Sequence, residues 1–184
     1  KFWLKFFKRL EELKVYKIIL SGGEPFLYKD IRSIIENLKN YRFRVEILTN
    51  ATLIDEEYAL LLSSKNIMLN CSLDGDKKEN DHIRGDGVFE NVLNTFKIFK
   101  KYNTNFSIST VINKLNLNSI NNLIKIAKEF GAYSLNLIPM DLIGRASINF
   151  NQTHMLSPKE FDKILLKISK YKDELKINVL NPFD

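Results

Sequence analysis

Glycines and carboxylates gather in two short segments of the sequence, each directly after a run of apolar residues. The first segment is Ser21-Gly22-Gly23-Glu24-Pro25, and the second is Ser72-Leu73-Asp74-Gly75. Glycine has no side chain, so a ligand can approach its backbone N–H and C=O groups closely. A carboxylate beside such a backbone adds a strong hydrogen-bond acceptor. The two segments therefore predict a binding site.

The apolar runs before these segments are predicted to be strands that alternate with amphipathic helices. The expected strands are residues 15–20, 45–48, 67–73, 106–112, 133–138 and 177–180, and the expected helices are residues 2–13, 28–40, 55–65, 87–102, 117–130 and 157–172. This alternation is typical of an α/β fold with a parallel sheet. We predict an incomplete parallel (βα) barrel with helices on the outside, and a single domain over residues 1–184.

Parallel strands joined by helices bring their carboxyl ends to one edge of the sheet, where ligands bind in α/β folds. At that edge we expect Asn50 after the second strand and Asn113 after the fourth, besides the two glycine-containing segments. Turns also collect Gly, Pro, Asn, Asp and Ser for structural reasons, so each turn alone has a structural alternative. Taken together, the turns favour a binding site at this edge.

Composition excludes several other classes of protein. With 184 residues, 45% of them hydrophobic and 27% charged, the chain has the composition of a soluble globular domain. No apolar run approaches the roughly 20 residues that cross a bilayer. The net charge of +6 includes no Lys/Arg block, so we expect no nucleic-acid partner. The single cysteine, Cys71, cannot supply the roughly four ligands of a structural metal site, so we assign no metal ligand and expect a buried thiol.

Five segments resemble, in order and spacing, the radical S-adenosylmethionine (radical SAM) enzymes. They are Gly22-Gly23-Glu24-Pro25, Leu48-Thr49-Asn50-Ala51, Ser72-Leu73-Asp74-Gly75, the stretch from Asp81 to Phe89 that contains His82 and Arg84, and Pro139 followed by Gly144-Arg145-Ala146. The chain is most similar to the SPASM branch, whose members continue into a cysteine-rich C-terminal domain and in many cases modify peptides or proteins. The resemblance extends from Val15 to Ala146.

The resemblance implies binding of S-adenosylmethionine, which a [4Fe–4S] cluster cleaves reductively to a 5′-deoxyadenosyl radical. The radical removes a hydrogen atom from a peptide, protein or other biosynthetic precursor, and an electron donor is a further implied partner. The turn of Gly22, Gly23 and Glu24, closed by Pro25, would receive the methionine ammonium group, which has three donors and needs acceptors. No catalytic residue is assigned.

Further contacts are implied for the other parts of S-adenosylmethionine. Ser72 and Arg84 would contact the ribose or the methionine carboxylate, with Asn50 as an additional cofactor contact. Adenine would lie against Val111 and the strand that contains Leu137 and Ile138, and Asp74 and Asn113 would contact substrate. Structural alternatives stay open for three of these residues. Arg84 could order the loop before residues 87–89, Ser72 could serve only as a cap or turn residue, and Asp74 could be a turn or N-cap residue.

The sequence departs from the family because it has no Cys-x-x-x-Cys-x-x-Cys loop. We therefore predict a fragment of a longer, cytoplasmic, cluster-bearing enzyme, inactive by itself. Two alternatives remain. The first is a non-catalytic binding module on the same barrel. The second is a phosphate-binding βα-barrel lyase or isomerase, in which residues 21–23 hold phosphate and Glu24 or Asp74 acts as the base.

Overall fold

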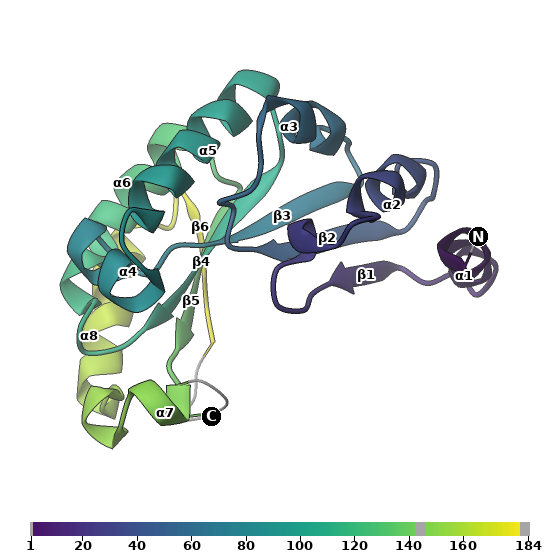
Figure 1. Ribbon diagram of the computed structural model, residues 1–184. Coiled ribbons are helices and arrows are strands. Elements are labelled where there is room, and N and C mark those ends of the chain that lie inside the picture. Colours follow the sequence, from purple (N-terminus) through teal and green to yellow (C-terminus); the bar gives the residue numbers. More distant parts are fainter. Residues whose placement is uncertain (1, 143–145, 181–184) are drawn as a thin grey trace. The chain divides into compact units, whose positions relative to one another are not determined.

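The structure is a computed structural model that describes residues 2–142 and 146–180 (Figure 1). Six strands form one sheet in the order in which they follow along the chain. They are β1 (Lys17–Leu20), β2 (Arg44–Thr49), β3 (Ile67–Ser72), β4 (Phe106–Ile112), β5 (Ser134–Pro139) and β6 (Lys176–Val179). The pairs β1–β2, β2–β3, β4–β5 and β5–β6 are all parallel. The predicted α/β class with a parallel sheet is confirmed.

Helices separate the strands. They are α1 (Phe2–Glu12), α2 (Ile31–Leu38), α3 (Glu56–Leu62), α4 (Lys77–Arg84), α5 (Val88–Tyr102), α6 (Ile120–Phe130), α7 (Ala146–Asn149) and α8 (Pro158–Ile168), with short 3-10 helices η1 (Pro25–Leu27), η2 (Leu117–Ser119), η3 (Gln152–His154) and η4 (Ser169–Tyr171). The sequence did not predict α4, since Ile83 is its sole aliphatic residue and gives no apolar stripe. Within the described residues, none of the helices has both the length and the apolar character that crossing a membrane requires.

The chain divides into two compact units. The first unit comprises residues 1–72 and 91–107, and the second comprises residues 73–90 and 108–184. Strands β1 to β3 belong to the first unit, and β5, β6 and most of β4 belong to the second. The single domain expected for residues 1–184 stays a prediction.

In the first unit, α2 and α3 lie on the same side of β2 and β3 (Figure 1). Alternate strand residues such as Val45, Ile47 and Leu69 are buried. Successive side chains of a strand point to opposite faces, so this alternation is expected when helices cover one face. The aromatic rings of Phe96 and Phe106 pack with their centroids 4.7 Å apart and extend this core to the start of β4. The apolar core therefore fixes which strand residues face the opposite, more polar side.

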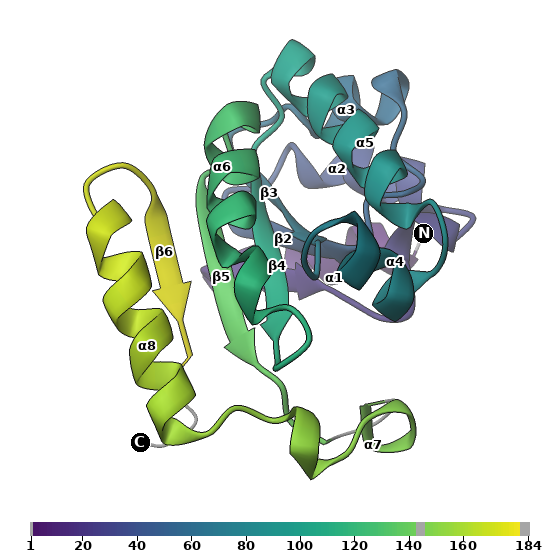
Figure 2. The ribbon, with the colours of Figure 1, turned by 90° about the vertical axis from the view of Figure 1, so that its left-hand side faces the viewer.

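In the second unit, α6 and α8 lie on the same side of β5 and β6, as Figures 1 and 2 show. Leu135 and Leu137 of β5 are fully buried, whereas the intervening Asn136 is only partly buried. The predicted capping box at the start of α8 is present, because Ser157 and Glu160 each accept the other's backbone N–H. The capping box fixes where α8 begins, and the buried leucines show which face of β5 the helices cover.

Candidate functional site

The first unit contains a carboxylate that joins the turn after β1 to the end of β2. Glu24 Oε1 accepts hydrogen bonds from Thr49 Oγ1 (2.8 Å) and from the backbone N–H of Phe26 (3.2 Å). Glu24 Oε2 accepts from the backbone N–H of Asn50 (2.7 Å). These bonds use three of the roughly four acceptor positions of a carboxylate. Glu24 is therefore fixed in one orientation and keeps limited capacity for a ligand.

Thr49 is a site residue to which sequence reasoning gave no role. Its hydroxyl donates to Glu24 and accepts the backbone N–H of Ala51 (3.0 Å), so it links the two turns. The feature of the sequence that could have pointed to Thr49 was its place in the Leu48-Thr49-Asn50-Ala51 segment. The Asn50 side chain, which was predicted to contact the cofactor, accepts at Oδ1 from the N–H and the hydroxyl of Thr52 (2.9 and 2.8 Å).

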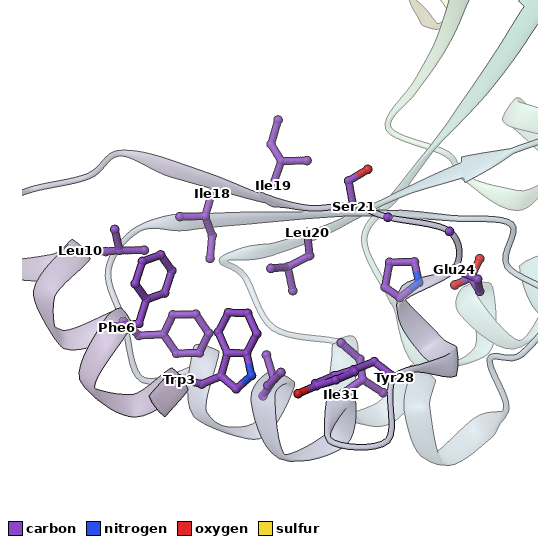
Figure 3. A pocket seen from close by; sticks show the side chains of 15 residues that line it. Trp3, Phe6, Leu10, Ile18, Ile19, Leu20, Ser21, Glu24, Tyr28 and Ile31 are labelled. Carbon is purple, nitrogen blue, oxygen red and sulfur yellow. The ribbon is translucent and has the colours of Figure 1, made fainter. Parts of the chain in front are cut away.

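The backbone of the Gly22-Gly23 turn is open. A Cβ atom placed on either glycine would meet no atom within 4 Å, so a ligand can approach these peptide groups. The turn forms one end of a cavity of about 660 Å³. The remaining walls are mostly apolar and include Trp3 and Phe6 of α1 and Leu20 of β1 (Figure 3). Polar groups for a ligand are thus concentrated at the Ser21–Glu24 end of the cavity.

Ser72 and Cys71 are adjacent residues at the end of β3 and face opposite sides of the sheet. The Cys71 thiol is fully buried, as predicted, while Ser72 is partly exposed. Burial raises the pKa of the Cys71 thiol, and the negative charge of Glu24 raises that pKa further. Cys71 is therefore a protonated core residue, and Ser72 presents the hydroxyl of this strand end.

In the second unit, Asp74 and Arg84 form an ion pair. Asp74 Oδ2 lies 2.6 Å from Arg84 Nη2, and Asp74 Oδ1 accepts the backbone N–H of Val111 (2.7 Å). The Asp74 side chain is 4% exposed and that of Arg84 is 24% exposed. Burial raises the pKa of Asp74, and the charge of Arg84 and the N–H of Val111 only partly oppose that increase. The pair is thus enclosed on the Asp74 side and reachable on the Arg84 side.

Two buried amides hold the loop that carries Asp74. Asn80 Oδ1 accepts the backbone N–H of Asp74 (2.9 Å), and Asn116 Nδ2 donates to the backbone oxygens of Asp74 and Val111 (2.9 and 2.8 Å). Both amide side chains belong to fully buried residues. Sequence reasoning missed them because a lone asparagine in a polar stretch carries no periodic or motif signal.

The predicted substrate contacts of Asp74 and Asn113 stay predictions, and in the structure both side chains have partners within the protein. Both carboxylate oxygens of Asp74 have partners within the protein, as described above. Asn113 is also buried, and its Oδ1 accepts the backbone N–H of Leu115 (2.8 Å) while its own N–H donates to Asn116 Oδ1 (2.9 Å). Buried polar groups pair within the protein because leaving them unpaired is costly. Asp74 is thus held by Arg84 and by the backbone of β4.

Val111 and Ile138 lie side by side on the face of the sheet opposite α6 and α8. They are register partners on β4 and β5 and are 36% and 38% exposed, so together they offer an apolar surface to a flat ring. The cofactor contact of Leu137 stays a prediction, and its side chain does not share the Val111–Ile138 surface. That side chain points to the helix-covered face and is fully buried, and its carbonyl accepts the N–H of Leu180 (3.2 Å). Gly144 and Arg145 lie outside the described residues.

These residues fit S-adenosylmethionine but not an iron–sulfur cluster. Arg84 Nε is buried without a hydrogen-bond partner, so this guanidinium has donor capacity that Asp74 does not use. The open Gly22-Gly23 backbone and the apolar Val111–Ile138 surface are further features that suit parts of the cofactor. By contrast, the described part of the chain holds no group of three or more His, Cys, Asp or Glu side chains able to bind a metal ion.

Similar proteins are consistent with this site chemistry. The chain is 31% identical over 165 residues to the AdoMet-dependent heme synthase of Methanosarcina barkeri, covering 88% of this chain and 46% of that protein. It is 30% identical over 160 residues to the cysteine-type anaerobic sulfatase-maturating enzyme of Clostridium novyi, covering 80% of this chain and 42% of that protein. The chain thus spans less than half the length of these two relatives.

The fold is also that of a solved structure. Streptococcus suis SuiB bound to S-adenosylmethionine superposes with a TM-score of 0.79 at 19% identity, over 97% of this chain and 43% of SuiB. SuiB bound to its precursor peptide SuiA gives a TM-score of 0.77 over 97% of this chain and 41% of SuiB. At this level of identity the likeness concerns the fold, and it agrees with the predicted incomplete barrel.

The family model described as "Radical SAM superfamily" matches residues 3–127, a range that contains both glycine turns and the Asp74–Arg84 pair. That range is well over half of the chain. The named relatives include enzymes, and the family uses S-adenosylmethionine together with a [4Fe–4S] cluster. The resemblance found in the sequence is confirmed, and the chain belongs to the radical SAM superfamily.

Proposed function

We propose that this chain is the S-adenosylmethionine-binding core of a radical enzyme that removes a hydrogen atom from a peptide, protein or other biosynthetic precursor. The observation that carries the proposal is the Gly22-Gly23 turn, whose open backbone lies beside a carboxylate fixed by Thr49 and Asn50. The peptide-bound structure of SuiB supports a peptide as the substrate. An electron donor and a cytoplasmic setting are further parts of the proposal.

The turn of the first unit would bind the ammonium group of the cofactor. Backbone carbonyls of Gly22 and Gly23 and the remaining acceptor position of Glu24 match the three donors of an ammonium group. Pro25 begins η1 directly after the turn, and its ring fixes the backbone there. Ser72, at the end of β3, supplies a neutral hydroxyl for the ribose or the carboxylate.

Residues of the second unit would bind the other charged and apolar groups of the cofactor. Arg84 is a cation for the methionine carboxylate, and Val111 and Ile138 would contact adenine. S-adenosylmethionine, when bound and reduced by one electron, supplies methionine and the 5′-deoxyadenosyl radical. The chain's own residues bind and orient the cofactor, which is the role of the protein in cofactor chemistry. Ligands for the cluster are not among the residues of this sequence.

Calorimetric titration of the 184-residue chain with S-adenosylmethionine tests the proposal. We expect saturable binding by the native chain, and a loss of affinity of about tenfold or more in Glu24→Gln, because a neutral amide cannot pair with the ammonium charge. Glu36→Gln makes the same change from carboxylate to amide at an exposed residue of α2, and it should bind S-adenosylmethionine like the native chain. Inorganic phosphate should not compete. Absence of saturable S-adenosylmethionine binding, or competition by phosphate, would contradict the proposal.

A further inference from the structure

We infer that Asp74 is a positioning residue that fixes Arg84 for the carboxylate of S-adenosylmethionine and that it does not contact substrate. The inference rests on the proposed function, because it concerns how Arg84 is held for that cofactor. Its basis is the arrangement of hydrogen bonds around Asp74 in the second unit.

The two oxygens of the Asp74 carboxylate have different partners. Oδ1 accepts the backbone N–H of Val111 at 2.7 Å, and Oδ2 lies 2.6 Å from Arg84 Nη2. One carboxylate therefore connects the end of β4, where adenine is proposed to lie, to the side chain proposed to hold the amino-acid part. An enclosed carboxylate of this kind sets the position of its partner because it has no other orientation that satisfies both bonds.

The contact of Asp74 with Arg84 leaves the Nε of Arg84 unpaired. A side-by-side Arg–carboxylate pair uses two parallel N–H groups of the guanidinium and both carboxylate oxygens. Here Oδ1 accepts the Val111 N–H, Arg84 Nη2 contacts Oδ2, and the buried Arg84 Nε has no acceptor. The guanidinium is thus fixed at one end, while its partly exposed remainder is available to an anion.

The loop of Asp74 is itself held rigidly. Asn80 accepts the Asp74 N–H, and Asn116 donates to the Asp74 carbonyl. Gly75 has φ +136°, and a Cβ there would lie 2.9 Å from Glu79 Cβ, so this position requires glycine. These constraints leave Asp74 little freedom to move, which is what a positioning role requires.

The test compares two ligands that differ in the part Arg84 would bind. S-adenosylmethionine carries the amino-acid group, and 5′-methylthioadenosine has the same adenosine without a carboxylate. In Asp74→Asn, Oδ1 can still accept the Val111 N–H, but the new amide presents N–H donors to Arg84. We expect the dissociation constant for S-adenosylmethionine to increase about tenfold or more, and that for 5′-methylthioadenosine to stay within about twofold of the native value.

Controls distinguish positioning from loss of fold. Asp162→Asn, an exposed residue of α8 in the same unit, makes the same charge change and should bind both ligands like the native chain. In an Arg84→Gln background, Asp74→Asn should cause little further loss, because its effect acts through Arg84. If Asp74→Asn does not fold, Asp74→Glu serves instead, since its longer side chain displaces Arg84 while keeping the charge.

The outcomes separate this inference from the function on which it rests. If the native chain binds S-adenosylmethionine but Asp74→Asn weakens both ligands equally, or weakens neither, Asp74 does not position Arg84 and the inference is overturned. Additive losses in the double variant would overturn it as well. If the native chain binds neither ligand, the proposed function fails and this inference fails with it.

Discussion

Glu24 and Asp74 show that a carboxylate in a ligand-binding motif can be engaged mainly by its own protein. Glu24 accepts three hydrogen bonds from η1 and from the end of β2, and Asp74 pairs with Arg84 and Val111. The sequence predicted where these carboxylates lie along the chain. It could not predict their partners, because residues such as Thr49 and Asn116 reach them through the tertiary fold.

Cys71 gives a prediction at the level of one residue. Its thiol is fully buried, and burial raises the pKa of that thiol. Alkylating reagents react with thiolates that are accessible to solvent, so the native thiol should react slowly. At pH 8 we expect iodoacetamide to modify the native chain at least about a thousandfold more slowly than the chain in concentrated urea, since modification requires unfolding. Mass spectrometry over time measures both rates, with glutathione as the reference thiol.

The alkylation experiment has a clear contrary outcome. A native rate close to that of glutathione would mean that β3 exposes its inner face to solvent in solution. The Cys71 thiol would then not be a buried, protonated group of the native chain.

At the level of elements, a side chain of α4 caps the start of α5. Asp81 Oδ1 accepts the N–H of Phe89 (2.8 Å), and Oδ2 accepts the N–H of Gly87 (3.1 Å). Phe89 lies in the first turn of α5, where backbone N–H groups lack partners within the helix. A polar residue outside the predicted helix thus decides where α5 begins.

Replacing Asp81 by alanine tests this cap. We expect a lower Tm at neutral pH, because two N–H groups lose their acceptor. The N–H of Phe89, together with that of Gly87, holds the pKa of Asp81 below its ordinary value. The stabilisation is therefore complete above an ordinary aspartate pKa of about 4 and is lost as the pH falls through the lower native pKa.

Thermal unfolding monitored by circular dichroism from pH 7 to pH 2 measures this effect. The Tm difference between the native chain and Asp81→Ala should shrink at the acidic end of the series. Asp86→Ala, at an exposed position in the adjoining loop, is the matched control and should unfold like the native chain. A Tm difference that is constant with pH would show that the charge of Asp81 does not contribute.

Asn116 connects the loop after β3 with the loop after β4 inside the second unit. Its buried amide makes three hydrogen bonds, to the oxygens of Asp74 and Val111 and from the N–H of Asn113. In Asn116→Ala these groups lose their partner in a buried environment, so we expect the free energy of unfolding to fall by about 2 to 5 kcal/mol. Urea unfolding curves give this quantity directly.

The control for Asn116 lies two residues away. Asn118 is an exposed residue of η2, and Asn118→Ala should change the free energy of unfolding by less than about 0.5 kcal/mol. Equal losses in the two variants would mean that η2 itself, and not the buried amide, accounts for the stability of this loop.

At the scale of the whole molecule, the apolar runs predicted the strands well, because β2 to β5 bury most of their apolar residues. All six expected strands are present, with ends that differ by at most two residues from the prediction. Helix α4 was missed because its residues are polar, and the positions of Leu137 and Asn113 were assigned without knowing which face or loop they occupy. Side-chain direction and buried polar pairing depend on tertiary packing, which a single sequence does not specify.

The apolar cavity between α1, β1 and α2 carries the last prediction. It has a volume of about 660 Å³ and is lined by Trp3, the single tryptophan of the chain, and by Phe6. Exposed apolar surface of this kind binds hydrophobic dyes. We expect anilinonaphthalene sulfonate to bind the native chain with increased fluorescence and to accept energy from Trp3. Phe6→Lys should reduce both signals, because it places a charge in the cavity wall.

Phe2→Lys is the matched control for this experiment. Phe2 is 71% exposed and lies outside the cavity lining, whereas Phe6 is 42% exposed and belongs to it. Both changes add one positive charge to the same helix, so a difference between them reports the cavity and not the net charge. Equal dye binding by the two variants would place the dye elsewhere on the chain. A larger loss for Phe6→Lys would show that α1 and β1 enclose an accessible apolar space in solution.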